Sequence, residues 1–420
     1  MLGAYGGIDT EAMVLYMKTL LAVATLSASS CATVPPSASN LDASSSDTAV
    51  SDAPTQTTEP VSFTTLAGSP FQALPTRDGA WVFVSLMTAD SGSPGVVVLS
   101  RTDGVVSFVR TVRLDEAPAG MVLTHDGKLL IVAAGSRLAF LDVDRLVSGA
   151  DGAVLGYMTE GTTAALGRIY VNVTLDDQFL FASDERAQTI TVIDLAKART
   201  SSFAASAIIG KIPVGNAPID LAFSVDEKYL YTTSESMPSK FGWPLACRPE
   251  GSSADTAPNH TTGAVIVVDV ARAKTDPATS VIATVPAGCN PVRLALSPKS
   301  DVAYVSARGD DSLLAFDTAK LLIDASRARI AELPVGPAPV GVAVFNSGQR
   351  VIVTSSNRFA VSVTDQQPLY VIDATNATAG ALAVLGTIPA GAFPREMRVT
   401  ADGRTLLVTN FTSKTRRLST

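Results

Sequence analysis

One unit of roughly fifty residues recurs along the chain and constrains its fold more than any other feature. Each copy has a proline, an alternating apolar stretch, a polar turn and a second apolar strand. The clearest copies are GNAPIDLAFSVDEKYLYTTSE (215–235), GCNPVRLALSPKSDVAYVSAR (288–308) and GPAPVGVAVFNSGQRVIVTSS (336–356), followed by 115–135, 391–411 and the weaker 67–87 and 165–185. The anchoring proline stands at 70, 118, 218, 291, 339 and 394, and Arg168 takes its place in the remaining copy. Repeats of this length indicate stacked supersecondary units.

A third and a fourth strand follow each pair, as in AVIVVDVA (264–271) and VIATVPAG (281–288). Four short antiparallel strands repeated in this way are typical of a β-propeller. We therefore predict an all-β, seven-bladed propeller of four-stranded blades over residues 61–420. Only two strands are clear after Pro394, with a third conceivable at Arg416–Thr420. We expect Val61–Leu66 to supply the fourth strand of that last blade, which would leave no open sheet edge.

The repeats resemble the YVTN family, whose unit reads approximately G-x-x-P-x-x-x-x-x-S-x-D-G-x-x-x-Y-V followed by a strand that ends in V-I-D. Phe223-Ser224-Val225-Asp226, Tyr229-Leu230-Tyr231 and Val192-Ile193-Asp194 match this pattern. The resemblance covers about residues 61–420. It implies a propeller fold strongly and a function weakly, because the family consists mostly of scaffolds.

The first 30 residues are typical of an export signal. Met17-Lys18 precedes the apolar run Thr19–Leu26 and the small residues up to Cys31, and the true start is either Met1 or Met17. A positive region, a short apolar region and small residues are the parts of a signal peptide. Cys31 stands where a bacterial lipoprotein carries its lipid, although Ala28 replaces the usual Leu. We expect a protein exported to the bacterial periplasm, outer membrane or cell surface, either anchored through Cys31 or secreted. An uncleaved apolar N-terminus with a chance cysteine is the alternative.

Residues 31–60 are rich in Ser, Thr, Pro and Ala and have almost no large apolar side chain. Such a segment buries too little surface to offset its ordering entropy, so we predict a disordered tether.

One blade carries an insertion at about 236–262, between its second and third strands, with Phe241, Trp243 and Cys247. That turn lies on the same face of a propeller as the turn between blades, where Cys289 stands. We therefore expect a Cys247–Cys289 disulfide in an oxidising compartment, with two free buried thiols as the alternative. Phe241 and Trp243 form either a recognition element or packing beneath their own loop.

Alternation along the innermost strands places the second and fourth residues after each anchor in the central channel. The first, third and fifth residues are mostly apolar and should pack between sheets. The second-position ring is Gln72, Gly120, Tyr170, Asp220, Arg293, Gly341 and Glu396, and the fourth-position ring is Leu74, Val122, Asn172, Ala222, Ala295, Ala343 and Arg398. The polar members form either a site for a small polar ligand or a mixed-charge channel whose ions satisfy one another.

Composition excludes several function classes. A net charge of −7 disfavours a nucleic-acid partner. Two His and three Cys are too few for a typical zinc site, and we expect neither a metal nor another cofactor. Channel histidines of the lactonase type are missing, and the two arginines oppose calcium at Asp220, Glu396 and Asn172.

We therefore predict a non-enzymatic scaffold at the bacterial envelope, a monomer that binds a small polar ligand or an envelope protein on the insertion face and meets the membrane only through a lipid anchor. The alternatives are a lactonase-like hydrolase that uses the channel carboxylates and a purely structural surface protein.

Overall fold

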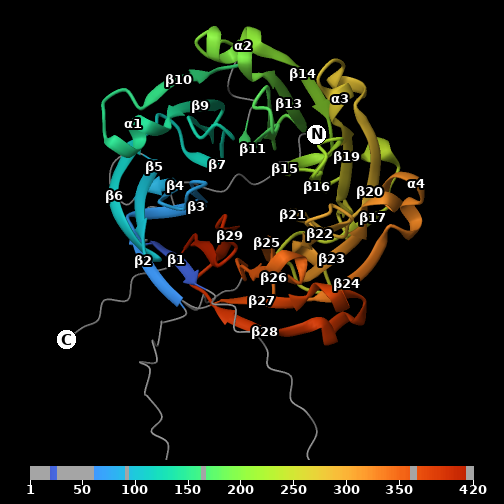
Figure 1. Cartoon of the computed structure of the whole chain (residues 1–420). Coiled ribbons are helices and arrows are strands. Elements are labelled where there is room, and N and C mark those ends of the chain that lie inside the picture. The colour runs from blue at the N-terminus through green and yellow to red at the C-terminus, as the bar shows by residue number, and fades with distance from the viewer. Residues whose placement is uncertain (1–18, 26–60, 90–93, 162–166, 360–366, 413–420) are drawn as a thin grey trace, which may run out of the picture.

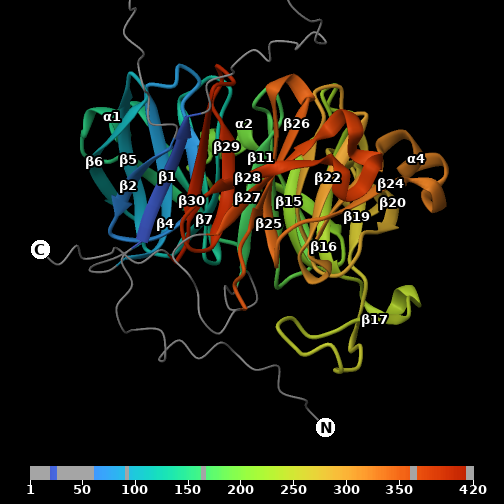
Figure 2. The same cartoon turned by 90° about the horizontal axis from the view of Figure 1, so that it is seen from below.

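The computed structural model describes residues 19–25, 61–89, 94–161, 167–359 and 367–412, and for 19–25 the backbone alone. The strands in these ranges form seven four-stranded antiparallel sheets and one two-stranded sheet. The large sheets stand round a central axis, and the chain passes from one to the next in order (Figure 1). Seen from the side, the molecule is a disc with the inserted loop projecting from one face (Figure 2). The predicted all-β propeller architecture is confirmed.

Each large sheet contributes one strand to each of four concentric positions. The innermost strands are β3 (Gly68–Pro75), β7 (Pro118–Leu123), β11 (Arg168–Val173), β15 (Asn216–Phe223), β21 (Pro291–Leu296), β25 (Pro339–Phe345) and β29 (Pro394–Val399). The second strands are β4 (Trp81–Ala89), β8 (Leu129–Ala134), β12 (Phe179–Asp184), β16 (Tyr229–Ser236), β22 (Val302–Ala307), β26 (Arg350–Ser355) and β30 (Thr405–Asn410).

The two outer positions complete the sheets. The third strands are β5 (Gly95–Thr102), β9 (Arg137–Asp142), β13 (Thr189–Asp194), β19 (Ala264–Asp269), β23 (Ser312–Asp317), β27 (Pro368–Asp373) and β1 (Thr19–Thr25). The outermost strands are β6 (Val105–Arg113), β10 (Val154–Met158), β14 (Ile208–Pro213), β20 (Val281–Pro286), β24 (Arg329–Pro334), β28 (Val384–Pro389) and β2 (Val61–Leu66).

The polar turn of six of the seven repeats is held by a hydroxyl and an aspartate. Thr124 Oγ1 donates to Asp126 Oδ1 at 2.6 Å and accepts the backbone N–H of Leu129 at 3.1 Å. Side-chain bonds of this kind stabilise tight turns and so favour a hairpin at this point. The same arrangement recurs with the hydroxyls of Thr76, Thr174, Ser224, Ser297 and Thr400.

The aspartate that ends the third strand begins a short helix. Asp142 Oδ1 accepts the N–H of Arg145 at 2.9 Å, which is an N-cap interaction. In this way five of the sheets connect their third strand to the outermost one. The helices are α1 (Val143–Ser148), α2 (Leu195–Thr200), α3 (Val270–Ala273), α4 (Thr318–Ile323) and the 3-10 segment η8 (Ala374–Ala383). The V-I-D signature of the repeat is therefore a strand end and a helix cap together.

Shorter 3-10 turns occur in the loops, at η2 (Ala205–Ala207), η3 (Ser239–Phe241), η4 (Pro277–Thr279), η5 (Arg308–Asp310), η6 (Ala325–Arg327) and η7 (Asn346–Gly348). Within the described ranges, no helix combines the length and the apolar character needed to cross a bilayer.

The hydrophobic core is divided among the spaces between neighbouring sheets. One buried cluster joins Phe140 and Leu138 of one sheet to Val171 and Leu180 of the next. The ring of Phe140 stacks on that of Phe203 with centroids 4.1 Å apart. Because each sheet buries both of its faces against neighbours, its strands carry apolar residues in long runs.

The ring closes between the first and the last sheet. Every innermost strand contacts the innermost strand of the following sheet, and β29 contacts β3. Val61–Leu66 forms the outermost strand of the last sheet, the place that was predicted for it. Its direct neighbour is β1, which pairs with β2 on one side and with β30 on the other. The conceivable third strand at 416–420 lies outside the described residues, as do Cys31 and the predicted tether.

Strand β1 lies within the predicted signal peptide. A cleaved signal could not remain in the sheet, so this pairing and cleavage before Cys31 cannot both hold for one mature chain.

Candidate functional site

The innermost strands do not alternate regularly at their beginning. Their pairing with the second strand shifts register between the anchor and the third position, for example between Pro118 and Met121. A β-bulge of this kind re-aims successive side chains. The first-position residues pack against one another across neighbouring sheets, in two buried clusters apart from those between the rest of the sheets: Phe71 with Ala119 and Ile169, and Ile219 with Val292 and Val340.

These first-position residues form an apolar layer in two clusters, one over the first three sheets and the other over the next three. The innermost strands start at the face that carries the insertion, so the layer lies toward that face. All six of these side chains are buried. The seventh copy has Arg395 at this position, where the pattern of the other copies predicts an apolar residue.

Below this layer, four of the predicted channel residues form one ionic cluster. Arg293 Nε lies 2.8 Å from Glu396 Oε2, and both side chains are nearly inaccessible. The hydroxyl of Tyr170 donates to Glu396 Oε1 at 2.7 Å, and Arg398 Nη2 lies 3.4 Å from the same oxygen. Arg398 also bonds to the Tyr170 hydroxyl. The guanidinium of Arg293 covers the Tyr170 ring at 4.2 Å from its centroid.

The other second-position polar residues are held by the backbone of neighbouring sheets. Gln72 donates to the Tyr170 hydroxyl at 3.2 Å and accepts the N–H of Met121. Asp220 Oδ2 accepts the N–H of Leu294 at 2.7 Å, and Oδ1 accepts that of Leu221 at 2.9 Å. The bonds from Gln72 and the bond between Asp220 and Leu294 cross from one sheet to another, so the cluster also ties the sheets together near the axis.

Both polar atoms of the Asn172 side chain are also hydrogen-bonded to the backbone. Its amide donates to the carbonyl of Leu221 at 2.9 Å, and its oxygen accepts the N–H of Val173 at 2.9 Å. Within the described ranges, no group of three or more His, Cys, Asp or Glu could hold a metal ion.

Burial shifts the proton equilibria of this cluster. Desolvation raises the pKa of Asp220 above its ordinary value, and Glu396 raises it further, although Arg293 acts in the opposite direction. Desolvation also raises the pKa of Tyr170, which stays protonated and can donate. Burial alone would lower the pKa of Arg293, but Glu396, Tyr170 and Asp220 together outweigh it and the pKa is raised.

A cavity of about 510 Å³ lies on the axis beside this cluster. Its polar wall contains Tyr170, Asp220, Arg293, Glu396 and Arg398, and all seven fourth-position residues line it. It extends along the innermost strands to Phe223, Leu296, Val344 and Val399, away from the insertion face.

Two guanidinium groups of this wall retain unused donors. Arg293 Nη1 is buried and has no hydrogen-bond partner in the part of the chain that the structure describes. The side chain of Arg398 is 36% exposed, so it meets the cavity directly. The wall therefore presents donors for a carbonyl or carboxylate oxygen next to the carboxylate of Asp220.

The insertion folds over the other face. Cys247, on β17 (Leu245–Cys247), is joined to Cys289 by a disulfide with Cα atoms 5.5 Å apart, as predicted. Strand β17 pairs with β18 (His260–Thr261). Phe241 is 41% exposed, whereas Trp243 is half-buried and packs against the core beneath. The two rings meet edge to face at 6.3 Å, so one aromatic of the predicted pair packs and the other faces solvent.

Neither protein-family models nor curated proteins match this chain. Solved structures match its fold. Hydrazine synthase of Kuenenia stuttgartiensis aligns with a TM-score of 0.59 and 14% identity, over 86% of this chain and 96% of the other. The periplasmic gluconolactonase of Pseudomonas aeruginosa aligns with a TM-score of 0.59 and 19% identity, over 91% of this chain and 99% of the other. A putative 6-phosphogluconolactonase of Bacteroides fragilis aligns with a TM-score of 0.55 and 14% identity, over 90% of this chain and 96% of the other. At these identities the likeness concerns the fold.

Proposed function

We propose that this chain hydrolyses a small polar lactone in the cavity on its axis. The observation that carries the proposal is a carboxylate with a raised pKa, Asp220, in one cavity wall with the unused guanidinium donors of Arg293 and Arg398. A volume of about 510 Å³ suits a compact ring with polar substituents. Two fold neighbours are named as a gluconolactonase and a putative 6-phosphogluconolactonase, which agrees with this substrate class.

In this mechanism the oxygen of a water molecule attacks the lactone carbonyl carbon, and Asp220 accepts a proton from that water. The carbonyl oxygen becomes an oxyanion that Arg398 and Arg293 stabilise. The bond from the carbonyl carbon to the ring oxygen then breaks, and Asp220 returns the proton to that oxygen as it leaves. The products are one hydroxy acid and a regenerated carboxylate. A general base contributes a factor of about 10² to 10⁴.

The test is proton release from glucono-δ-lactone and γ-butyrolactone by the full chain, followed with a pH indicator. Asp220→Asn should lower kcat at least a hundredfold, within the usual range for a general base. Asp255→Asn, an exposed change in the inserted loop, is the matched control. If the wild type accelerates neither reaction, or if Asp220→Asn keeps its rate, the hydrolase proposal fails.

Binding without chemistry is the second candidate, favoured by the contacts that both cavity carboxylates already make. The oxygens of Glu396 are engaged by Arg293 on one side and by Tyr170 and Arg398 on the other. Both oxygens of Asp220 accept backbone N–H groups, which a water-activating base would have to share. Calorimetric titration with gluconate would then detect binding that Arg398→Gln weakens while lactones are not consumed. The purely structural role requires that neither lactone nor gluconate is bound.

We further propose that the seven sheets are the blades of a YVTN-type propeller over 61–420, exported and attached through lipid at Cys31. The disulfide supports export, because such bonds persist in oxidising compartments. A fold neighbour described as periplasmic agrees with it. Intact mass of the mature protein decides the N-terminus. A lipidated chain that starts at Cys31 has lost β1, whereas a chain that retains residues 19–25 keeps the strand and excludes cleavage at Cys31.

A further inference from the structure

Arg395 occupies an environment that suits a cation poorly. It follows Pro394 and takes the place that an apolar side chain has in the other six copies. Its guanidinium carbon lies 4.1 Å from the ring centroid of Phe71, 5.1 Å from that of Phe411 and 5.6 Å from that of Phe393. Aromatic faces attract a guanidinium, but they do not neutralise its charge.

No carboxylate compensates Arg395 among the described residues. It makes no ion pair within 4 Å, and its Nε is buried without a hydrogen-bond partner. Burial lowers the pKa of Arg395 to about 9, and the charges of Arg293 and Arg358 contribute to the shift. Arg395 is half-buried as a whole, and a guanidinium that loses water is usually paired, because an isolated charge is costly there.

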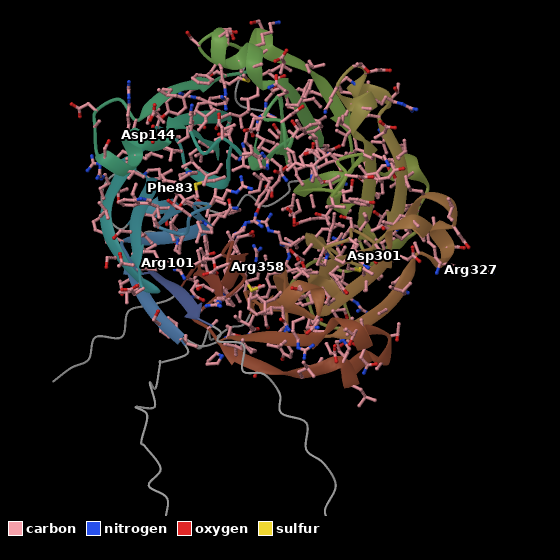
Figure 3. All side chains as sticks on the ribbon, viewed as in Figure 1. Phe83, Arg101, Asp144, Asp301, Arg327 and Arg358 are labelled. Carbon is pink, nitrogen blue, oxygen red and sulfur yellow. A yellow bond between two sulfur atoms is a disulfide. The ribbon has the colours of Figure 1, made fainter. Side chains whose placement is uncertain are left out.

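Arg358 is a second arginine that lies against aromatic rings without a carboxylate partner among the described residues. Its guanidinium carbon lies 5.5 Å from the ring of Phe393, which Arg395 also contacts, and 5.1 Å from that of Phe359. It too has no ion pair in the described part of the chain, and burial lowers its pKa. Figure 3 places Arg358 near the central axis of the ring. Two cations therefore share one aromatic ring with no anion between them.

The neighbouring Arg308 shows what full compensation looks like at this face. Its Nη2 lies 2.8 Å from Glu235 Oε1 and 2.8 Å from Glu250 Oε2, and its Nε also contacts Glu250. Glu185 is close enough to influence the charge state of Arg395, yet it forms no ion pair with it within 4 Å. The fold thus places three carboxylates near these arginines and pairs two of them elsewhere.

We infer that Arg395 and Arg358 form a second anion site, which binds a small organic monocarboxylate at the insertion-side end of the axis. The planar guanidinium matches a carboxylate with two parallel hydrogen bonds. The half-buried ring of Phe411 and the exposed ring of Phe359 would contact the hydrocarbon part of such a ligand. Glu185, Glu235 and Glu250 oppose a more highly charged anion such as phosphate.

This site is separate from the lactone cavity. Arg395 and Arg358 do not line that cavity. Arg395 instead lies against Phe71, which belongs to the apolar first-position layer. The inference therefore stands without the proposed hydrolase activity.

The experiment is calorimetric titration of the full chain with sodium benzoate in a chloride-free buffer, with inorganic phosphate as a second probe. We expect saturable benzoate binding that is at least tenfold weaker in Arg395→Met and in Arg358→Gln. Arg327→Gln is the matched control, because its side chain is 82% exposed on the rim of the disc (Figure 3). Asp220→Asn should bind benzoate as the wild type does, which separates this site from the lactone cavity.

Melting temperature without ligand gives an independent readout. Arg395→Met removes an unpaired charge and leaves an apolar side chain against three aromatic rings, so the melting temperature should stay equal or rise. A clear fall would mean that Arg395 is a structural cation and would overturn the inference. Absence of benzoate binding to the wild type, unchanged binding by Arg395→Met, or tighter binding of phosphate than of benzoate would overturn it as well.

Discussion

The hydroxyl of Thr409 donates a hydrogen bond of 3.0 Å to the backbone carbonyl of Phe71, and so joins the last sheet of the ring to the first. The same oxygen accepts the backbone N–H of Glu396 at 3.2 Å. Comparable bonds link Ser183 to Ile219, Thr233 to Val292 and Ser306 to Val340, each across neighbouring sheets. At each of these four links, one hydroxyl connects a sheet to the innermost strand of the next.

Removal of the Thr409 hydroxyl should weaken the contact between the last and the first sheet. Thr409→Ala leaves the N–H of Glu396 and the carbonyl of Phe71 without this partner in a buried setting, which costs about 1–3 kcal/mol of the free energy of unfolding. Urea denaturation at neutral pH measures the change. Thr409→Ser keeps the hydroxyl and should lose much less. Equal stability of the alanine and serine variants would show that the hydrogen bond contributes nothing to closure.

The disulfide should protect the inserted loop. Cys247 and Cys289 are 42 residues apart, and the chain-entropy model gives at most about 4 kcal/mol for a loop of this length. Replacement of both by serine should lower the melting temperature and speed tryptic cleavage after Lys240, which is exposed and is followed by Phe241. Digestion followed by mass spectrometry identifies the cut. If this site is cut no faster than in the wild type under oxidising conditions, the bridge does not restrain the loop.

Acid should weaken the hairpin turns. A hydrogen bond from Ser224 and contacts from Lys228 lower the pKa of Asp226 to about 2, and the turn hydroxyls lower the pKa of Asp78 and Asp402 in the same direction. Because the folded pKa lies below the unfolded value, this stability is fully present above about pH 4 and is lost as the pH falls toward 2. Urea midpoints at pH 7, 4 and 3 measure the loss.

Asp226→Asn should reduce the dependence on pH in that window, whereas Asp255→Asn, in the inserted loop, should leave it unchanged. An unchanged slope in Asp226→Asn would contradict this origin of the acid sensitivity.

Lactone hydrolysis should show an acid limb that Asp220 sets. Burial raises the pKa of this carboxylate, so the active, ionised form is lost at a higher pH than for an ordinary aspartate. The rate should rise with pH through a single inflection above 3.8 and then level off. The profile of kcat/KM measures it. An inflection at or below the ordinary value would exclude Asp220 as the base.

Much of the architecture was predictable because its causes are local. The proline anchor, the hydroxyl–aspartate turn and the capping aspartate recur in sequence, and each stabilises a conformation within a few residues of itself. The Cys247–Cys289 bridge followed from strand parity, which needs only the count of strands between the two cysteines. In six of the seven copies a Ser or Thr stands 13 residues after the second-position residue of the innermost strand, at Ser85, Ser183, Thr233, Ser306, Thr354 and Thr409. This recurrence is visible in the sequence, but the group that each hydroxyl contacts in the next sheet is not.

The sequence by itself determined the order and pairing of the strands in each repeat, because alternation and turn chemistry act between neighbours in the chain. Only the tertiary structure decided what meets on the axis. Each innermost strand begins with a register shift, and there Phe71 contacts Ala119 and Ile169 of other sheets and Arg395 lies against Phe71. Such contacts depend on how far each sheet tilts and how closely the sheets approach, and no single repeat contains that distance.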